Sequence, residues 1–246
     1  MERIKSPICV LYISNQSWFN GGAPRSLYEI LKNLDRSRIN PYFASIYDGK
    51  LASQIQDLEI PFFKLNKFKY TPPFFAFSSV IDLIHHIRNN HIQLIHNNQC
   101  DDALYSWIPA KLTNTPMVIH HRDPSFFKRN RFLLNHADAN IAISNWQNEH
   151  NLQNKGIVIH NGIDLKKFNL SDSVNAKEYP KKIVVGLLGR IVYIKGQDVF
   201  IKAAKLVSEK YADVQFLIVG DDQDPTSQEY IQQVKALVRE LNLEDS

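Results

Sequence analysis

The sequence lacks the long hydrophobic run that a membrane-spanning helix needs. Such a helix requires about 20 consecutive apolar residues, and no stretch of the 246-residue chain approaches that length. A secretory signal is missing as well, because the apolar run Ile8–Ile13 is short and no small-residue cleavage site follows it. We therefore expect a cytoplasmic protein.

Cysteine and metal-binding clusters are also scarce. Cys9 and Cys100 are the only cysteines, and neither belongs to a C-x-x-C pair or a histidine cluster. We expect two buried thiols in a reducing compartment. No carboxylate cluster is suited to Mg²⁺, so the sequence predicts no bound metal.

A dinucleotide-binding fingerprint is absent. The nine glycines include no G-x-G-x-x-G, and no carboxylate is well placed to bind a ribose, which argues against a Rossmann-type oxidoreductase. The net charge of +4 is mild and fits a phosphate-bearing substrate or an anionic membrane surface. Without a basic recognition helix or an RNA-binding aromatic motif, we expect no nucleic-acid partner.

The sequence does contain a regular alternation of strand and helix patterns. Short apolar runs bounded by glycine or polar residues are typical of buried parallel strands. We predict strands at 8–14, 41–47, 61–65, 92–95, 116–120, 139–143, 157–159, 183–188 and 214–219. We predict helices at 24–34, 51–58, 80–88, 102–112 and 197–211, a short one capped by Ser144, and a last one opening at Asp224-Pro225. On the helix at 197–211 the expected inward face is Val199, Phe200, Ala203, Ala204 and Val207.

Residues 166–182 are polar and lack apolar periodicity, which indicates a linker. Alternating strands and helices on both sides of it predict an α/β protein of two Rossmann-like domains. We place the first domain at 1–165 and the second, a partial one, at 183–246.

The loop after the strand Ile183–Leu188 carries two cations. Gly189 ends the strand, Arg190 and Lys195 follow, and a helical pattern opens at Gly196. Such loops lie at the carboxyl edge of a parallel sheet, where open α/β folds bind ligands. Arginine, lysine and a helix N-terminus all favour phosphate oxygens. The stretch predicts a diphosphate-binding pair, with a solvated basic surface loop as the alternative.

Two further places are candidates for ligand contact. Gly21-Gly22 stands between the first strand and its helix, where glycines let backbone N–H groups approach an anion, although a tight turn explains it equally well. His120 and His121 end a strand, next to Arg122 and Asp123. Histidine there suits chemistry near neutral pH, and a purely structural role is the alternative.

Basic residues are mixed with aromatic ones in two segments. Lys67 and Lys69 precede a diproline, and Lys128 and Arg129 follow Phe126-Phe127. If exposed, these segments would contact a membrane surface or an acidic acceptor. The alternative is that the aromatic residues pack beneath the loops.

Four motifs occur in the order found in a known family. They are Gly21-Gly22-Ala23, Asn161-Gly162-Ile163-Asp164, Gly189-Arg190-x4-Lys195-Gly196 and Phe216-Leu217-Ile218-Val219-Gly220. Together they resemble retaining family-4 glycosyltransferases of the GT-B fold, over nearly the whole chain. The resemblance implies a nucleotide-diphosphate sugar held between two domains. It also implies a glycan, lipid-linked sugar or similar hydroxyl acceptor on the N-terminal domain, and no metal or other cofactor.

The resemblance also implies roles for individual residues. Arg190 and Lys195 match the pair that binds the donor diphosphate, and Gly21 and Gly22 match the glycine loop facing the donor phosphates. The histidine near the transferred sugar is His120 or His121, with His120 as the first choice.

The sequence departs from the family at its C-terminal end. The family's E-x7-E motif follows the helix that here ends near Leu241, and the chain stops at Ser246 without it. We therefore expect a fragment of a longer enzyme or a truncated product with impaired activity. The alternative function is a non-catalytic, glycan- or membrane-binding remnant. With either function, a membrane contact would place the cytoplasmic protein peripherally at the inner face of the membrane.

Overall fold

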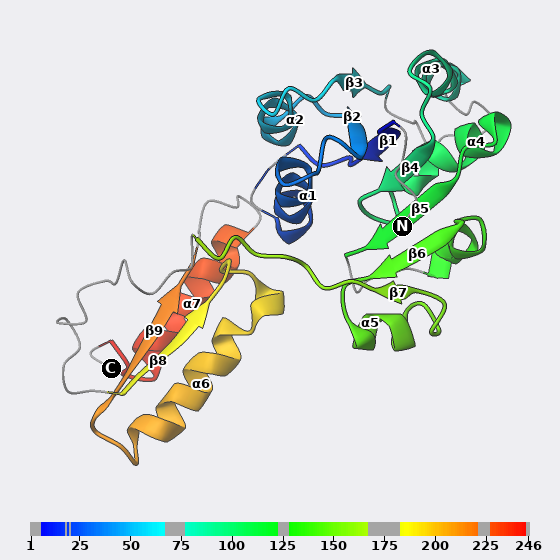
Figure 1. Cartoon of the computed structure of the whole chain (residues 1–246). Helices are drawn as coiled ribbons and strands as arrows, with labels where there is room; N and C mark the ends of the chain where they lie inside the picture. The colour runs from blue at the N-terminus through cyan, green and yellow to red at the C-terminus, as the bar shows by residue number, and fades with distance from the viewer. Residues whose placement is uncertain are drawn as a thin grey trace. The chain divides into compact units, whose positions relative to one another are not determined.

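The chain folds into two compact units, Met1–Lys167 and Phe168–Ser246, each built on a parallel sheet (Figure 1). The computed structural model describes residues 6–17, 19, 21–66, 77–122, 128–166, 183–220 and 227–244. The predicted linker at 166–182 lies outside these residues except for Lys166. Among the helices that the structure describes, none is long and apolar enough to cross a bilayer.

The N-terminal unit is organised around a seven-stranded sheet in the order β3-β2-β1-β4-β5-β6-β7. Every neighbouring pair is parallel. The strands are β1 (Ile8–Ile13), β2 (Ile39–Ser45), β3 (Phe62–Lys64), β4 (Leu94–Asn97), β5 (Met117–His121), β6 (Ala139–Ala142) and β7 (Ile157–Val158). The strand order reverses between β1 and β4, and open α/β sheets bind their ligands at the carboxyl edge beside such a point.

Helices cover both faces of this sheet (Figure 1). They are α1 (Gly22–Lys32), α2 (Lys50–Gln56), α3 (Phe77–Asn89), α4 (Ala103–Thr113), the 3-10 helix η1 (Lys128–Asn135) and α5 (Asn145–His150). Leu11 and Ile13 of β1 pack in the cluster formed by α3, α4 and η1, whereas Val10 and Tyr12 pack in the cluster formed by α1 and α2. Burial on both faces explains why β1 is a continuous apolar run.

The second unit has a two-stranded parallel sheet of β8 (Ile183–Leu188) and β9 (Val214–Val219). The 3-10 turn η4 (Tyr193–Lys195) and the helix α6 (Gln197–Ser208) follow β8, and α7 (Gln228–Glu240) follows β9. The buried core consists of Ile201, Ala204, Val234 and Leu243, and Phe216 and Ile218 of β9 pack against it.

One packing prediction for this unit is wrong, and a second is right only in part. The β8 run was expected to be buried, but Val184 is 37% and Leu188 78% exposed. The helices of the described chain pack against Phe216 and Ile218 of β9, and β8 side chains of both alternating sets stay exposed, Val185 at 39% as well as Val184. On α6 the predicted inward residue Ala204 is buried, but Val199 is 64% exposed, and the buried Ile201 was not predicted.

The two cysteines differ from expectation in their burial. Cys9 and Cys100 are free thiols, and both are half-buried rather than fully buried. Burial nevertheless raises the pKa of the Cys100 thiol above its ordinary value, and the neighbouring Asp101 and Asp102 raise it further. The thiolate form of Cys100 is therefore disfavoured.

The small core of the second unit generates a stability prediction. Ile201→Ala should cost about 2–5 kcal/mol, as other large-to-small core substitutions do, which is enough to unfold a unit of this size. We expect amide hydrogen exchange in β8, β9, α6 and α7 to lose most of its protection. Val199→Ala on the exposed side of α6 is the matched control and should change little. Equal protection in both variants would contradict this account of the core.

Candidate functional site

Polar side chains from distant parts of the chain meet at the carboxyl edge of the N-terminal sheet. His120 and Arg122 come from the end of β5, and Asn98 follows β4 directly. Ser26 lies in the first turns of α1, and Asn161 lies in the turn after β7. Hydrogen bonds join all five residues.

Arg122 is at the centre of this group. Its Nε donates to Asn98 Oδ1 at 2.8 Å, and its Nη1 donates to Ser26 Oγ at 2.6 Å and to Asn161 Oδ1 at 2.5 Å. Its Nη2 lies 3.0 Å from His120 Nδ1. Asn98 in turn donates to the carbonyl of Ala23 at 3.2 Å. The guanidinium thus connects three loops at the sheet edge with the first turn of α1.

The hydrogen-bond partners of the charged Arg122 side chain are neutral groups. The side chain is 8% exposed, and within the described part of the chain no carboxylate lies at ion-pair distance from it. Burial lowers its pKa to about 10, so it remains a cation at neutral pH. A buried cation whose described partners are all neutral contributes a positive potential to its surroundings.

His120 is buried beside this cation. It is 4% exposed, and its Nε2 atom has no hydrogen-bond partner in the described part of the chain. Burial lowers its pKa to about 2, and the nearby Arg122 adds to the effect. The imidazole is therefore neutral at physiological pH.

His121 points to the opposite face of the sheet, because successive strand residues alternate. Its Nε2 lies 2.9 Å from Asn140 Oδ1 of β6, and Asn140 Nδ2 donates to the carbonyl of Leu134. Burial lowers the pKa of His121 as well. His121 thus contacts Asn140 of β6, which in turn bonds to η1, and it points away from Arg122.

A buried carboxylate holds the loops that follow β1 and β4. Asp102 accepts from the backbone N–H of Asn15 at 2.8 Å and from that of Gln99 at 2.9 Å. The side chain of Asn15 then accepts from the backbone N–H of Ile46 after β2. Asp102 is 2% exposed, and burial raises its pKa to about 7 against the lowering effect of the two N–H donors.

The glycine pair lies at the start of α1. Gly21 is the N-cap residue, and no side chain caps the helix. A Cβ on Gly22 would meet nothing within 4 Å, whereas one on Gly21 would lie 3.2 Å from Pro24 Cδ. Gly22 is therefore not required by packing within the described chain, and the first N–H groups of α1 have no side-chain acceptor.

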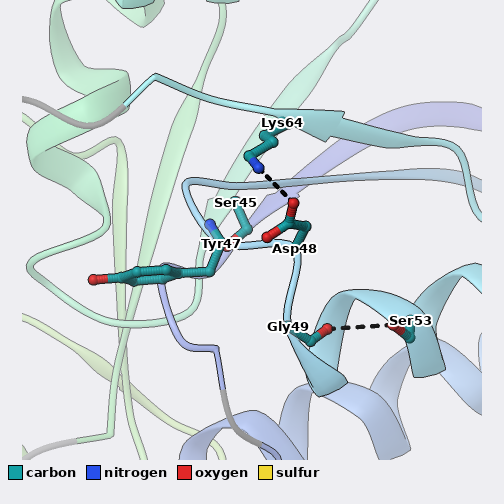
Figure 2. Close-up of polar contacts among 6 residues, drawn as sticks. All are labelled: Ser45, Tyr47, Asp48, Gly49, Ser53 and Lys64. Carbon is teal, nitrogen blue, oxygen red and sulfur yellow. Dashed lines mark hydrogen bonds and ion pairs between the residues drawn. The ribbon is translucent and has the colours of Figure 1, made fainter.

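The loop after β2 supports the loop after β1. A Cβ on Gly49 would lie 2.3 Å from the carbonyl oxygen of Ser17, so this close approach requires glycine. On the outer side, Lys64 at the end of β3 pairs with Asp48, as Figure 2 shows. Figure 2 also shows Ser53 Oγ donating to the Gly49 carbonyl at the start of α2.

In the second unit, Arg190 and Lys195 lie between β8 and α6, and both are exposed. Gly189 (φ +157°) and Gly196 (φ +69°) bracket them in backbone conformations that favour glycine. The Arg190 carbonyl accepts from Gln197 Nε2 at 2.8 Å. A Cβ on Gly189 would lie 3.9 Å from Lys195 Cδ, so the lysine stem runs alongside Gly189. Gly196 is the N-cap of α6 and supplies no side-chain acceptor, while the Asp198 N–H in the first turn donates to Tyr230 Oη at 3.2 Å.

The remaining predicted site residues are not tested. Lys67 and Lys69 lie outside the described residues, and Lys128 and Arg129 begin η1 with side chains that are not described. Among the described residues, no group of three or more His, Cys, Asp or Glu side chains is arranged to hold a metal ion.

Sequence reasoning missed several members of the site. Arg122 was noted only as a neighbour of the histidines, and Asn98, Ser26 and Asp102 were not candidates at all. The available signal was position: Asn98 and Arg122 directly follow buried parallel strands, and such positions lie at the ligand-binding edge.

Family models match both halves of the chain. The model of Glycosyltransferase Family 4 matches residues 20–167, which is more than half of the chain. The model of glycosyl transferases group 1 matches residues 171–246. A comparison with curated proteins finds no match.

Solved glycosyltransferases share the fold. Anabaena HepE bound to UDP-glucose is 20% identical with a TM-score of 0.72, and the match covers 96% of this chain and 67% of HepE. A glycosyltransferase from Rickettsia africae is 19% identical with a TM-score of 0.79, over 97% and 66% of the two chains. The lipopolysaccharide outer core galactosyltransferase WaaB is 16% identical with a TM-score of 0.67, over 97% and 66%. These matches confirm the predicted GT-B fold class, and the chain spans about two-thirds of the length of these proteins.

The buried carboxylate of the site predicts a pH dependence of stability. Folding raises the pKa of Asp102 from 3.8 to about 7, so between these values the folded unit binds a proton that the unfolded chain releases. The stabilisation that comes from protonated Asp102 is complete below the pKa of the unfolded state. It is lost as pH rises through the pKa of the folded state. We expect the free energy of unfolding to fall by roughly 2 kcal/mol or more from pH 4 to pH 8.

Tryptophan fluorescence measures this effect in the N-terminal unit alone, because Trp18, Trp107 and Trp146 all belong to it. Urea denaturation at several pH values should show the slope in the wild type and a smaller slope in Asp102→Asn. An identical slope in the variant would mean that another group is responsible.

Proposed function

Because the chain belongs to glycosyltransferase family 4, we propose that it transfers a sugar from a nucleotide-diphosphate sugar to a hydroxyl group of an acceptor, with retention of anomeric configuration. The reaction uses no metal in this proposal, since side-chain cations meet the charge of the diphosphate. The proposal concerns the activity of the whole protein, and the chain covers about two-thirds of the similar solved proteins.

A UDP-hexose is the donor that we propose. Two of the similar structures of Anabaena HepE contain UDP with glucose and UDP-glucose. The fold shared with HepE extends over nearly all of the 246 residues of the present chain. At this level of sequence identity the comparison supports a shared fold. The choice of sugar is therefore part of the proposal.

The β8–α6 loop carries the proposal. It places Arg190 and Lys195 directly before the N-terminus of α6, between Gly189 and Gly196, and the cap residue Gly196 supplies no side-chain acceptor there. As the bond to the sugar breaks, negative charge develops on the departing diphosphate. Fixed cations and helix N–H groups stabilise that charge most in the transition state, which lowers the barrier.

The N-terminal unit supplies the other contacts in this proposal. The free N–H groups at Gly22 and the start of α1 face donor phosphates, with nothing within 4 Å of a Cβ at Gly22 to block an approaching ligand. His120, rather than His121, lies near the transferred sugar. His120 Nε2 has no partner in the described chain, whereas His121 already contacts Asn140.

The acceptor is a glycan, a lipid-linked sugar or a similar hydroxyl compound on the N-terminal side. Lys67, Lys69, Lys128 and Arg129 remain the proposed contacts to an acidic acceptor or a membrane surface. Flotation with liposomes containing anionic lipid tests them: loss of flotation when all four are changed to alanine supports the contact, and unchanged flotation excludes it.

The proposal is tested first by donor binding. Isothermal calorimetry of the 246-residue chain with UDP-glucose, UDP-galactose and a GDP-sugar should detect binding of at least one donor. Chromatography of the same mixtures should detect slow hydrolysis of that donor. If no nucleotide sugar binds to the folded chain, the proposed function is wrong.

The cationic loop generates a second prediction. Arg190→Ala combined with Lys195→Ala should weaken UDP binding by about 2–4 kcal/mol, because two charge-assisted hydrogen bonds are lost. Lys210→Ala, just beyond the C-terminal end of α6, is the control, since it removes a surface cation outside the loop. Equal affinity of the double variant and the control in calorimetry would refute the diphosphate assignment.

Gly22 of the glycine pair generates a third prediction. Gly22→Ala should leave unfolding within about 0.5 kcal/mol of the wild type, as for other surface substitutions, because its surroundings are open. Donor turnover should nevertheless fall roughly tenfold or more, since the methyl group occupies space next to the helix N–H groups. Unchanged turnover would show that Gly22 does not face the donor.

A further inference from the structure

The contact between Arg122 and His120 has only one chemically possible direction. Arg122 Nη2 lies 3.0 Å from His120 Nδ1. A guanidinium has five N–H donors and no acceptor, so His120 Nδ1 must accept. A nitrogen that accepts carries no proton, and the single proton of a neutral imidazole is therefore on Nε2.

We propose that Arg122 is a positioning residue that holds His120 in its neutral, Nε2-protonated form, so that His120 serves only as a hydrogen-bond donor to a bound substrate. The inference rests on the proposed function in one respect: the acceptor of that hydrogen bond is taken to be an oxygen of the donor or acceptor sugar. It removes His120 from consideration as a general acid or a general base.

The guanidinium is itself held in place, which fixes the direction of the contact. Asn98 accepts from Nε, and Ser26 and Asn161 both accept from Nη1. These partners come from the end of β4, from α1 and from the turn after β7, so they restrain Arg122 from three sides. Rotation of the guanidinium away from His120 would break these bonds inside a buried site, where unmade hydrogen bonds are costly.

Every charged or titratable group that acts on His120 in the described chain opposes its protonation. Arg122 is a cation at 3.0 Å, His96 of β4 lies with its ring 5.5 Å from that of His120, and His121 is next in sequence. Tyr12 of β1 lies beyond His96, with ring centroids 5.1 Å apart. A second proton on Nδ1 would place two cations in contact, which explains why the pKa of His120 is far below its ordinary value.

The other ring nitrogen is the one left for a ligand. His120 Nε2 is buried and has no hydrogen-bond partner in the described chain. Buried polar atoms in proteins almost always have a partner, so a buried N–H donor at the ligand-binding edge of a sheet indicates contact with a substrate oxygen. A neutral donor suits a sugar hydroxyl, because it adds no net charge to a site that already holds Arg122.

Nuclear magnetic resonance of the chain labelled with 15N-histidine tests this directly, without any substrate. The signal is assigned as the one lost in His120→Gln. We expect His120 to show a protonated Nε2 and a bare Nδ1 that stay unchanged between about pH 5.5 and 8, the range where ordinary histidines titrate. A protonated Nδ1, or titration within this range, would overturn the proposal.

Two variants show whether Arg122 is the cause. In Arg122→Met the histidine should populate the Nδ1-protonated form or begin to titrate. In Ser26→Ala, which removes one partner of Arg122 but leaves the contact to His120 intact, the spectrum should stay as in the wild type. An unchanged spectrum in folded Arg122→Met would assign the tautomer to another cause and overturn the role of Arg122. If that variant does not fold, the wild-type spectrum still decides the tautomer.

The activity arm compares two substitutions of His120 itself. The amide nitrogen of glutamine reaches the place of Nε2, and that of asparagine reaches the place of Nδ1. We expect the donor turnover of His120→Gln to be roughly tenfold or more higher than that of His120→Asn, which is the factor expected for one hydrogen bond. Equal loss in both would overturn the donor role. If the chain binds no nucleotide sugar, the proposed function is contradicted, whereas the measurement of the His120 tautomer remains valid.

Discussion

A buried guanidinium whose hydrogen-bond partners in the described chain are all neutral organises the carboxyl edge of the N-terminal sheet. Arg122 is 8% exposed and is held by neutral acceptors from Asn98, Ser26, Asn161 and His120. A buried charge is tolerated only when its hydrogen bonds are made. The positions of three loops and of α1 therefore depend on one side chain, and so does the protonation state of His120.

A second buried ionisable group, the carboxyl of Asp102, connects the loop after β4 to a further loop. Asp102 accepts from the backbone of Asn15 and Gln99, which ties the loop after β1 to the loop after β4 at the point where the strand order reverses. Gly49 lets the loop after β2 approach Ser17. Buried ionisable groups and a close backbone contact thus hold the edge that open α/β folds use for ligands.

The two units differ in how much of their sheet is covered. In the N-terminal unit, clusters on both faces bury residues 10–13 of β1, whereas in the described part of the second unit the helices pack against Phe216 and Ile218 of β9 and leave β8 largely exposed. The second unit nevertheless has a well-formed β8–α6 loop, because its shape depends on local features: Gly189, Gly196 and the bond from Gln197 to the Arg190 carbonyl. The loop that is proposed to bind the diphosphate therefore keeps its shape beside a small core.

The amino-acid sequence by itself determined the order of strands and helices, because hydrophobic period and turn residues are local properties. The strands at 183–188 and 214–219 match β8 and β9, the N-cap at Ser144 is confirmed by its bond from the Gln147 N–H, and the motifs identified the family. Only the tertiary structure decided which side chains meet. Ser26 and Asn161 are 135 residues apart, and they contact Arg122 because strand order and register bring α1, β5 and the turn after β7 together. His120 and His121 look alike in sequence, and the pleat of β5, which turns them to opposite faces, is what separates their roles.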